Sequence, residues 1–307
     1  MLKRISPMKP MLRDEVFQSK NWLYQAKWDG VRMLAYLDQG NIRLINGKGA
    51  DRTERYPDMI ASLSRLPFTN VILDGELVVF HQGKSDFFQI LKRDLVSASH
   101  RIQILARQLP VHFMIFDLLY EESRLLIDQY LSYRQARLQD LFSHVKEERI
   151  QQTDSFDDGS ALWEETRHRG WEGIIMKERE GLYHPGGKHP TWQKVKHFRL
   201  LTATVSGVIL GTGGVHSLAL ALPEGKNGWR YIGRAGSGLS AEERQILADW
   251  YPSQERSSPT VVNPPSDRDI HWIVPSLQVK VRYLEWTPVG SLRSPRIEGF
   301  LSSSSSI

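Results

Sequence analysis

Short apolar runs alternate with amphipathic stretches through the first two-thirds of the chain, which predicts a mixture of strands and helices. Trp22 to Lys27 is a predicted strand. Arg32 to Leu37 and Asn41 to Ile45 flank a glycine-containing turn, so they are predicted to form a hairpin. Val71 to Phe80 and Val111 to Tyr120 consist mainly of β-branched, aromatic and other apolar residues, which is typical of buried strands.

Two helices are expected among these strands. Ser132 and Gln135 have the spacing of a capping box, which predicts a helix that runs toward Phe142. Ser160 is expected to cap another helix, and Gly170 to end it, because glycine readily adopts the left-handed conformation found after helices. The first part of the chain is therefore predicted to be of α+β type.

The pattern changes near residue 198, where short strands separated by glycine-rich turns become predominant. Ser240 and Glu243 form a second capping box and predict one helix that ends near Tyr251. Five strands and one helix are the elements of a small Greek-key barrel of the OB type. The last residues, Ser302 to Ser306, are a predicted flexible tail. The five predicted strands are Thr202 to Leu210, His216 to Leu222, Trp229 to Arg234, His271 to Val274 and Leu277 to Trp286.

The composition fits two folded domains. The chain has 307 residues, of which 40% are hydrophobic. The formal net charge of +5 is compatible with a polyanionic partner and equally with ordinary solubility. The chain contains no cysteine, which excludes disulfides, cysteine nucleophiles and cysteine-built zinc sites. We expect a cytoplasmic protein without membrane contact, because the sequence shows neither a signal peptide nor a long apolar span.

Several charged residues recur at spacings that suggest chemistry. Asp74 and Glu76 stand two apart on a predicted strand and therefore share one face. Lys194 and Lys196 do the same, and two like charges on one strand face are unfavourable without an anion between them. The chain carries six short motifs in this order: Lys27-Trp28-Asp29-Gly30-Val31-Arg32, Leu73 to Phe80, Phe113 to Tyr120, Trp171 to Lys177, Trp192 to Lys196 and Leu292 to Arg296.

This ordered set resembles the covalent nucleotidyltransferases, and most closely the ATP-dependent DNA ligases. Within these it is similar to the ligase domain of bacterial end-joining enzymes, here standing alone. The resemblance implies a nucleotidyltransferase (adenylation) domain of antiparallel sheets with helices over residues 1–198. A five-stranded OB-fold β-barrel with the serine-rich tail would follow over residues 199–307.

The resemblance also implies the reaction and its partners. The expected enzyme seals nicks in double-stranded DNA through a covalent lysine–AMP intermediate and an adenylated DNA 5′-phosphate. ATP and Mg²⁺ are the implied cofactors, with Mn²⁺ as an alternative metal. A Ku-type end-binding protein is an implied partner, and a monomer is expected. The pathway remains open among end joining, excision repair and phage-like replication, as does the preference among nicks, cohesive ends and blunt ends.

The implied nucleophile is Lys27. A free lysine has a pKa of about 10.4, and we expect partial burial and the nearby cations Lys194 and Lys196 to disfavour its charged form. Phe116 is expected to stack on adenine, although a phenylalanine in an apolar strand is more often a core residue. The resemblance implies metal ligation by Glu76 and Glu172, and nucleotide contacts by Gln25, Arg32, Glu76, Phe116, Lys177, Lys194, Lys196, Arg293 and Arg296.

Some of these assignments have plain alternatives, and two positions depart from the family pattern. Arg293 and Arg296 are expected at the β- and γ-phosphates, but a basic segment that contacts DNA would look the same. Gln25 stands where many relatives carry glutamate; its amide still offers an acceptor oxygen to the adenine amino group. Ile45 stands where relatives carry an arginine, for which Arg43, Lys48 and Arg52 are candidate substitutes.

Two other functions satisfy part of the pattern. An RNA ligase or an mRNA capping guanylyltransferase would use the same lysine chemistry, and labelling by ATP or by GTP would separate these. A non-catalytic OB-type nucleic-acid binder would also fit the basic charge and the barrel. Such a binder would hold nicked DNA without sealing it, whether or not Lys27 was present.

Overall fold

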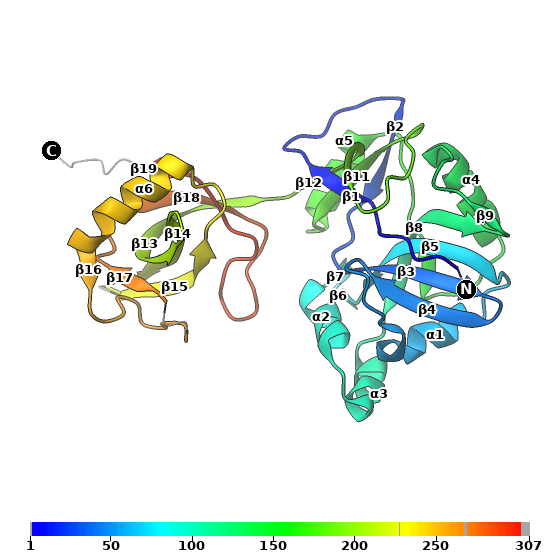
Figure 1. Cartoon of the computed structure of the whole chain (residues 1–307), viewed down its shortest axis with the longest axis horizontal. Coiled ribbons are helices and arrows are strands. Elements are labelled where there is room, and N and C mark those ends of the chain that lie inside the picture. The colour runs from blue at the N-terminus through cyan, green and yellow to red at the C-terminus, as the bar shows by residue number, and fades with distance from the viewer. Residues whose placement is uncertain (1, 227, 267–268, 302–307) are drawn as a thin grey trace. The chain divides into compact units, whose positions relative to one another are not determined.

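The computed structural model describes residues 2–226, 228–266 and 269–301. The chain forms two compact units, Met1–His197 and Phe198–Ile307, and the predicted boundary after residue 198 lies one residue beyond this division. Figure 1 shows the elements of each unit. The predicted serine-rich tail, Ser302 to Ser306, lies outside the described residues. None of the helices in the described ranges is long and apolar enough to cross a bilayer.

The first unit is built on two main sheets (Figure 1), and β6 and β7 form a separate two-stranded sheet. The smaller main sheet has the strand order β1-β12-β11-β2, and the larger has the order β10-β8-β5-β3-β4, with β9 paired to β8. The elements of this unit are β1 (Lys9–Leu12), β2 (Trp22–Ala26), β3 (Val31–Asp38), β4 (Asn41–Asn46), η1 (Thr53–Arg55), α1 (Pro57–Leu63), β5 (Asn70–Val78), β6 (Phe80–His81), β7 (Lys84–Ser85), α2 (Phe87–Leu95), α3 (Ser99–Gln108), β8 (His112–Glu121), β9 (Arg124–Leu125), α4 (Leu131–Phe142), β10 (Ile150–Gln152), α5 (Gly159–His168), β11 (Gly173–Glu178) and β12 (Lys188–Lys196).

The predicted hairpin is confirmed as β3 and β4, which pair in antiparallel register. Gln39 and Gly40 join them with φ angles of 49° and 86°. Positive φ at both turn positions matches the right-handed twist of the flanking strands, and glycine accepts it without steric cost. The predicted strands around β2, β5 and β8 are likewise present.

Strand β5 divides its side chains between two surroundings. Leu73 and Leu77 pack into the main core, which also receives apolar residues of α1, α2 and α4. Asp74 and Glu76 point to the opposite face, as the two-residue period of a strand requires. That face is turned toward the smaller sheet, because Ile72 packs in one cluster with Trp192 of β12. The space between the two sheets therefore receives polar side chains from both.

The two predicted helices of this unit exist, but their starts differ from the prediction. Ser132 does not cap α4, which begins at Leu131 without a side-chain cap. Backbone carbonyls of Arg179 and Gly181 accept from the first two amide groups of this helix, so no capping side chain is needed. Ser160 does not cap α5 either, because the Asp158 carboxylate accepts from Ala161 N at 2.9 Å.

Within the described residues, the second unit is a seven-stranded sheet with one α-helix. The helix α6 carries the predicted capping box of Ser240 and Glu243. Prediction missed two strands, β16 and β19. The sheet does not close by a continuous ladder, but a parallel bridge joins Ser237, after β15, to Arg296 of β19. The elements are β13 (Arg199–Gly211), β14 (Gly214–Glu224), β15 (Gly228–Ala235), α6 (Ala241–Trp250), η2 (Tyr251–Gln254), β16 (Glu255–Arg256), β17 (His271–Ile273), β18 (Gln278–Tyr283) and β19 (Arg296–Leu301).

Candidate active site

A pocket of about 190 Å³ opens between the two sheets of the first unit. Seven of the side chains singled out in the sequence line it, and they come from six different strands and the segment after β2. The lining residues are Pro10, Gln25, Ala26, Lys27, Trp28, Arg32, Glu76, Phe116, Ile175, Lys177, Trp192 and Lys194. Residues separated by more than 160 positions thus meet in one cavity.

Lys27 follows β2, and its backbone amide donates to Gly173 O at 2.9 Å. Its Nζ donates to Glu172 Oε2, and the other oxygen of that carboxylate lies 2.7 Å from Lys196 Nζ. The Glu172 side chain is 5% exposed, so one buried carboxylate holds two ammonium groups. Three residues that the sequence analysis placed in the site are therefore directly joined.

The charge state of Lys27 differs from the expectation. Burial disfavours the ammonium, but the negative charges of Glu172, Glu76 and Asp29 outweigh it and raise the pKa of Lys27 above its usual value. Burial also favours protonation of Glu172, yet Lys27 and Lys196 hold the pKa of that carboxyl well below its usual range. The expectation that surrounding cations weaken the charge was wrong, because the acidic neighbour is closer. In this state Lys27 is a protonated ion-pair partner.

Glu76 is the carboxylate that lines the pocket, and its pKa is shifted in the direction opposite to that of Glu172. Burial raises the pKa of Glu76 to about 8, although the charges of Lys27 and Arg32 oppose that shift. Within the described part of the chain, no side chain or amide donates a hydrogen bond to its carboxylate. Glu76 therefore holds a proton near neutral pH or requires a cation that the protein itself does not supply.

The pKa of Glu76 predicts a dependence of stability on pH. An unfolded glutamate loses its proton near pH 4.5, whereas folded Glu76 keeps it until about pH 8. The folded state binds the extra proton between these values, so this group's contribution to stability falls as pH rises through that window. We expect Glu76→Gln to exceed the wild type in unfolding free energy by about 1–2 kcal/mol more at pH 8.5 than at pH 5.

Equilibrium urea unfolding at both pH values measures this difference. Glu54→Gln, at an exposed position in η1, is the matched control for loss of one carboxylate. A difference between Glu76→Gln and wild type that stayed the same at both pH values would contradict the prediction.

Arg32 is held within the site by an acid that the sequence analysis had not assigned to it. Its Nε and Nη2 donate to Asp74 Oδ1 and Oδ2 at 2.8 and 2.6 Å, while Tyr183 OH donates to Asp74 Oδ2 at 2.7 Å. Asp74 is fully buried, so the pair is bidentate and shielded from solvent. The guanidinium also lies over the Phe116 ring, 4.8 Å from its centroid. Arg32 thus lines the pocket with two of its three guanidinium nitrogens already bonded to Asp74.

Phe116 presents its ring to the pocket and its carbonyl to two donors. Lys177 Nζ donates to Phe116 O at 3.1 Å and lies 4.1 Å from the ring centroid of Trp192. Lys177 is 1% exposed, so its ammonium supports the Phe116 backbone and does not extend freely toward a phosphate. Burial is the main cause that lowers the pKa of Lys177 to about 7, and it outweighs the opposing charge of Asp117.

Comparison with known families identifies this arrangement. The family model of the ATP dependent DNA ligase domain matches residues 3–196, and that of the ATP dependent DNA ligase C terminal region matches residues 211–302. The chain belongs to the ATP-dependent DNA ligases. The first match covers the whole pocket, and the second covers most of the OB-fold unit, so both predicted domain types are confirmed.

The relatives of this ligase include end-joining proteins. It is 33% identical over 290 residues to the multifunctional non-homologous end joining DNA repair protein LigD of Mycobacterium tuberculosis, which covers 92% of this chain and 36% of the relative. The chain thus spans about a third of that relative's length. The crystal structure of the ligase domain from M. tuberculosis LigD matches with 30% identity and a TM-score of 0.56, over 97% of this chain and 95% of that one. A mycobacterial DNA ligase D complexed with ATP and MES matches with 30% identity and a TM-score of 0.58, over the same shares of both chains.

Lys194 and Lys196 of this ligase occupy the same face of β12, but their surroundings differ. Lys196 is paired with Glu172, whereas Lys194 lines the pocket and has no carboxylate partner among the described residues. Burial, followed by the charges of Lys196 and Lys27, lowers the pKa of Lys194 to about 8. Lys194 is therefore the pocket cation that is available to an anion.

The arginines of the final motif belong to the second unit and are not among the residues that line the pocket. Arg293 Nη1 donates to Glu285 Oε1 at 2.7 Å, and Arg296 Nε lies 3.5 Å from Glu298 Oε1. The Arg296 side chain is 53% exposed, which leaves most of its guanidinium in solvent. Their expected contact with ATP remains a prediction.

No substitute for the arginine expected at position 45 lines the pocket. Ile45 itself is 3% exposed and packs in a core cluster with Trp192. Arg43 pairs with Asp51, Arg52 lies 3.4 Å from Asp94, and Lys48 is exposed in the turn after β4. The hydrophobic side chain at position 45 thus has a packing role, and the missing guanidinium is not replaced within this cavity.

Sequence reasoning missed several residues that shape the site. Trp28 and Ile175 line the pocket and lie inside two of the six motifs, so membership of a motif could have identified both as site residues. Asp74 was identified as acidic, but its partner across the sheet was not. Gln135 contacts Gln25 from helix α4, and no local spacing marks it. Gly30 lies inside the first motif, and an added Cβ there would lie 2.2 Å from Leu77 O, so packing against β5 requires this glycine.

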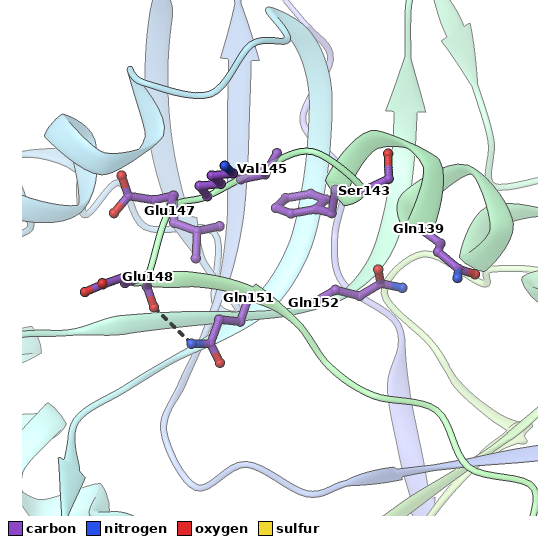
Figure 2. A pocket seen from close by; sticks show the side chains of 10 residues that line it. Gln139, Ser143, Val145, Glu147, Glu148, Gln151 and Gln152 are labelled. Carbon is purple, nitrogen blue, oxygen red and sulfur yellow. Dashed lines mark hydrogen bonds between the residues drawn. The ribbon is translucent and has the colours of Figure 1, made fainter.

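A larger hollow lies elsewhere in the same unit and contains none of the predicted site residues (Figure 2). Its volume is about 550 Å³, and it lies between the C-terminal half of α4 and β10. Glu147 accepts there from Arg65 Nε at 2.8 Å, and Gln151 donates to Glu148 O at 3.0 Å. No residue of the six motifs lines it, so this hollow is not a second candidate for the nucleotide.

Proposed function

We propose that this DNA ligase seals nicks in duplex DNA by three in-line displacements at phosphorus. Lys27 Nζ attacks the α-phosphorus of ATP, a nitrogen–phosphorus bond forms, and pyrophosphate leaves. A DNA 5′-phosphate oxygen then displaces the lysine and takes the adenylate. Finally a 3′-hydroxyl attacks the activated 5′-phosphorus, the DNA bond closes, and AMP leaves. Such steps depend mainly on positioning and charge neutralisation.

The single observation that carries this proposal is the placement of Lys27. Its ammonium is paired with Glu172 and lies at a pocket that also contains an aromatic ring, the Lys194 cation and the Glu76 carboxylate. A nucleotide would place its base between the Phe116 ring and Ile175, which line the same cavity, and its phosphates toward Lys194. Lys27 must separate from Glu172 and lose a proton before it can attack, because only the neutral amine is nucleophilic.

The remaining residues receive roles from the same placement. We assign the ribose to Glu76 and Arg32, adenine recognition to Gln25, and phosphate contact to Lys196 once Glu172 releases it. Lys177 is proposed to stabilise the base site by its hydrogen bond to the Phe116 carbonyl. Arg293 and Arg296 are proposed to contact the β- and γ-phosphates when the OB-fold unit meets the nucleotide.

Mg²⁺ or Mn²⁺ is the proposed metal. No three acidic or histidine side chains in the described ranges converge on one point, so the protein offers no complete cage. A hard cation that keeps its waters and binds one or two carboxylates fits this donor set. Glu76 suits it because no described residue donates to its carboxylate, and Glu172 could join by exchanging an ammonium group. When bound, the metal would neutralise charge on the phosphate oxygens.

Nicked double-stranded DNA is the proposed substrate, and end joining is the proposed task. The support is the function named for the LigD relatives, of which this chain matches one part. A Ku-type end-binding protein is the proposed recruiter, on the same ground. We propose that the ligase acts as a monomer, because the pocket is completed by residues of a single chain.

Intact-mass measurement after incubation with ATP and Mg²⁺ tests the proposal. We expect an adduct of the mass of AMP that peptide mapping places on Lys27. Chelation of the metal should prevent its formation, and Lys27→Met should form none. Lys20→Met, which removes an exposed lysine close to the start of β2, is the matched control and should form the adduct. Absence of an adduct in the wild type, or labelling by GTP alone, would refute the proposed function.

A further inference from the structure

The amide of Gln25 is oriented by a chain of hydrogen bonds that begins at the backbone of Phe116. Gln135, on helix α4, donates from Nε2 to Phe116 O at 2.9 Å. Gln25 Nε2 in turn lies 3.3 Å from Gln135 Oε1 and 3.0 Å from Ser155 Oγ. Gln25 is 1% exposed and lines the nucleotide pocket. Its Oε1 receives no hydrogen bond from any described residue.

The direction of this chain follows from the chemistry of its first member. A backbone carbonyl can only accept, so Gln135 must turn its NH₂ group toward Phe116. Its oxygen is then turned toward Gln25, which must answer with its own NH₂ group. Ser155 strengthens this order, because its hydroxyl accepts from Gln25 and donates to Gln135 Oε1 at 3.4 Å. The Gln25 oxygen is therefore left for the pocket.

The second lone pair of the Phe116 carbonyl is also used. Lys177 Nζ donates to the same oxygen at 3.1 Å, so both acceptor sites of that carbonyl are filled by buried donors. The Phe116 carbonyl, where this series of hydrogen bonds begins, is thus fixed on strand β8 and has no acceptor site left for water. A glutamate at position 25 would not need to be oriented by Gln135, because both of its oxygens accept hydrogen bonds. A glutamine carries an accepting oxygen and a donating NH₂ group, so its amide must be oriented.

We propose that Gln135 is a positioning residue that holds the Gln25 oxygen toward the base, so that the pocket selects a purine with an amino group at C6 over one with a carbonyl there. The inference rests on the proposed function, since it concerns the base of the nucleotide that adenylates Lys27. A 6-amino group donates to the Gln25 oxygen, whereas a 6-carbonyl would face it with a second acceptor. Without Gln135, the Gln25 amide can rotate by half a turn and offer a donor.

Competition between ATP and inosine triphosphate in the self-adenylation reaction tests this role. Inosine triphosphate carries the 6-carbonyl, with a proton on N1, but lacks the 2-amino group of guanine, so it changes only the edge of the base around C6. The ATP is uniformly labelled with ¹³C and ¹⁵N, so that intact mass separates the two lysine adducts in one tube, and their ratio does not depend on the fraction of folded protein. We expect Gln135→Met to lower the ATP preference of the wild type by about tenfold or more, with a smaller change in the ATP rate.

A rescue variant and a matched control complete the experiment. Gln25→Glu in the Gln135→Met background should restore the preference, because a carboxylate presents an acceptor in either orientation. Gln139→Met makes the same chemical change one turn further along α4, where the side chain lines the separate hollow of Figure 2, and should keep the wild-type ratio.

The outcomes separate the two proposals. Wild-type preference in Gln135→Met, or no recovery in the Gln25→Glu double variant, would overturn the positioning role and leave the ligase reaction standing. A wild type that forms neither lysine adduct would instead refute the proposed function itself.

Discussion

Replacing Lys27 by methionine will reduce sealing of an ordinary nicked duplex by more than about a thousandfold, yet leave sealing of a pre-adenylated nick within about tenfold of the wild type. In the proposed mechanism, the lysine takes part in the bonds made and broken in the first two displacements. In the third, the 3′-hydroxyl attacks the 5′-phosphorus and AMP leaves directly from DNA, so no bond to Lys27 changes. Methionine keeps the length of the side chain, and Lys196 remains to neutralise the buried Glu172.

Gel separation of sealed and unsealed strands measures both reactions on substrates that differ only in the adenylate at the 5′-phosphate. Lys20→Met, at an exposed position outside the pocket, serves again as the matched control and should seal both substrates. If Lys27→Met sealed the ordinary nick with added ATP, the nucleophile would be a different residue. If it failed on both substrates, Lys27 would also be needed to hold the adenylated end.

Replacing Arg134 by methionine will destabilise the first unit by about 3–5 kcal/mol. Arg134 Nε and Nη2 each donate at 2.8 Å to Asp117, and both side chains are 0% exposed. Arg134 Nη1 also donates to Gln129 O at 2.6 Å, which joins α4 to the segment that precedes it. Removal of the guanidinium leaves the Asp117 carboxylate buried without its counter-ion, which is far more costly than loss of an exposed pair.

Arg137→Met on the same helix is the matched control. Arg137 also makes a two-pronged pair, with Glu121, but its side chain is 37% exposed. Solvent screens that pair, so we expect its removal to cost less than about 1 kcal/mol. Equilibrium urea unfolding followed by tryptophan fluorescence measures both variants. Equal losses of unfolding free energy for Arg134→Met and Arg137→Met would contradict the role of burial.

The buried pair also shows how the strand that carries Phe116 depends on a residue outside every motif. Asp117 follows Phe116 on β8, so Arg134 fixes the strand that presents the aromatic ring. Lys177 lies close enough for the charge of Asp117 to oppose the fall in its pKa. We therefore expect Arg134→Met to weaken ATP binding as well as stability, although Arg134 does not line the pocket.

Local periodicity accounts for the parts of the site that the sequence predicted. Asp74 with Glu76, and Lys194 with Lys196, were placed on common strand faces by the two-residue alternation alone, and each pair does share a face. The helix starts were less predictable. Ser132 and Ser160 had suitable chemistry, but backbone carbonyls and Asp158 reached the first turns instead. Capping depends on what else lies close to the helix end, which a spacing rule does not contain.

The sequence by itself determined the order of the six motifs, the strands that contain most of them and membership of the DNA ligases. Each of these depends only on residues that are close together in the sequence. The tertiary structure decided the partners. Lys27 with Glu172, Arg32 with Asp74, and Gln25 with Gln135 are separated by 145, 42 and 110 positions. Only folding brings such groups within hydrogen-bonding distance, and the sign of the Lys27 pKa shift follows from which opposite charge comes closest.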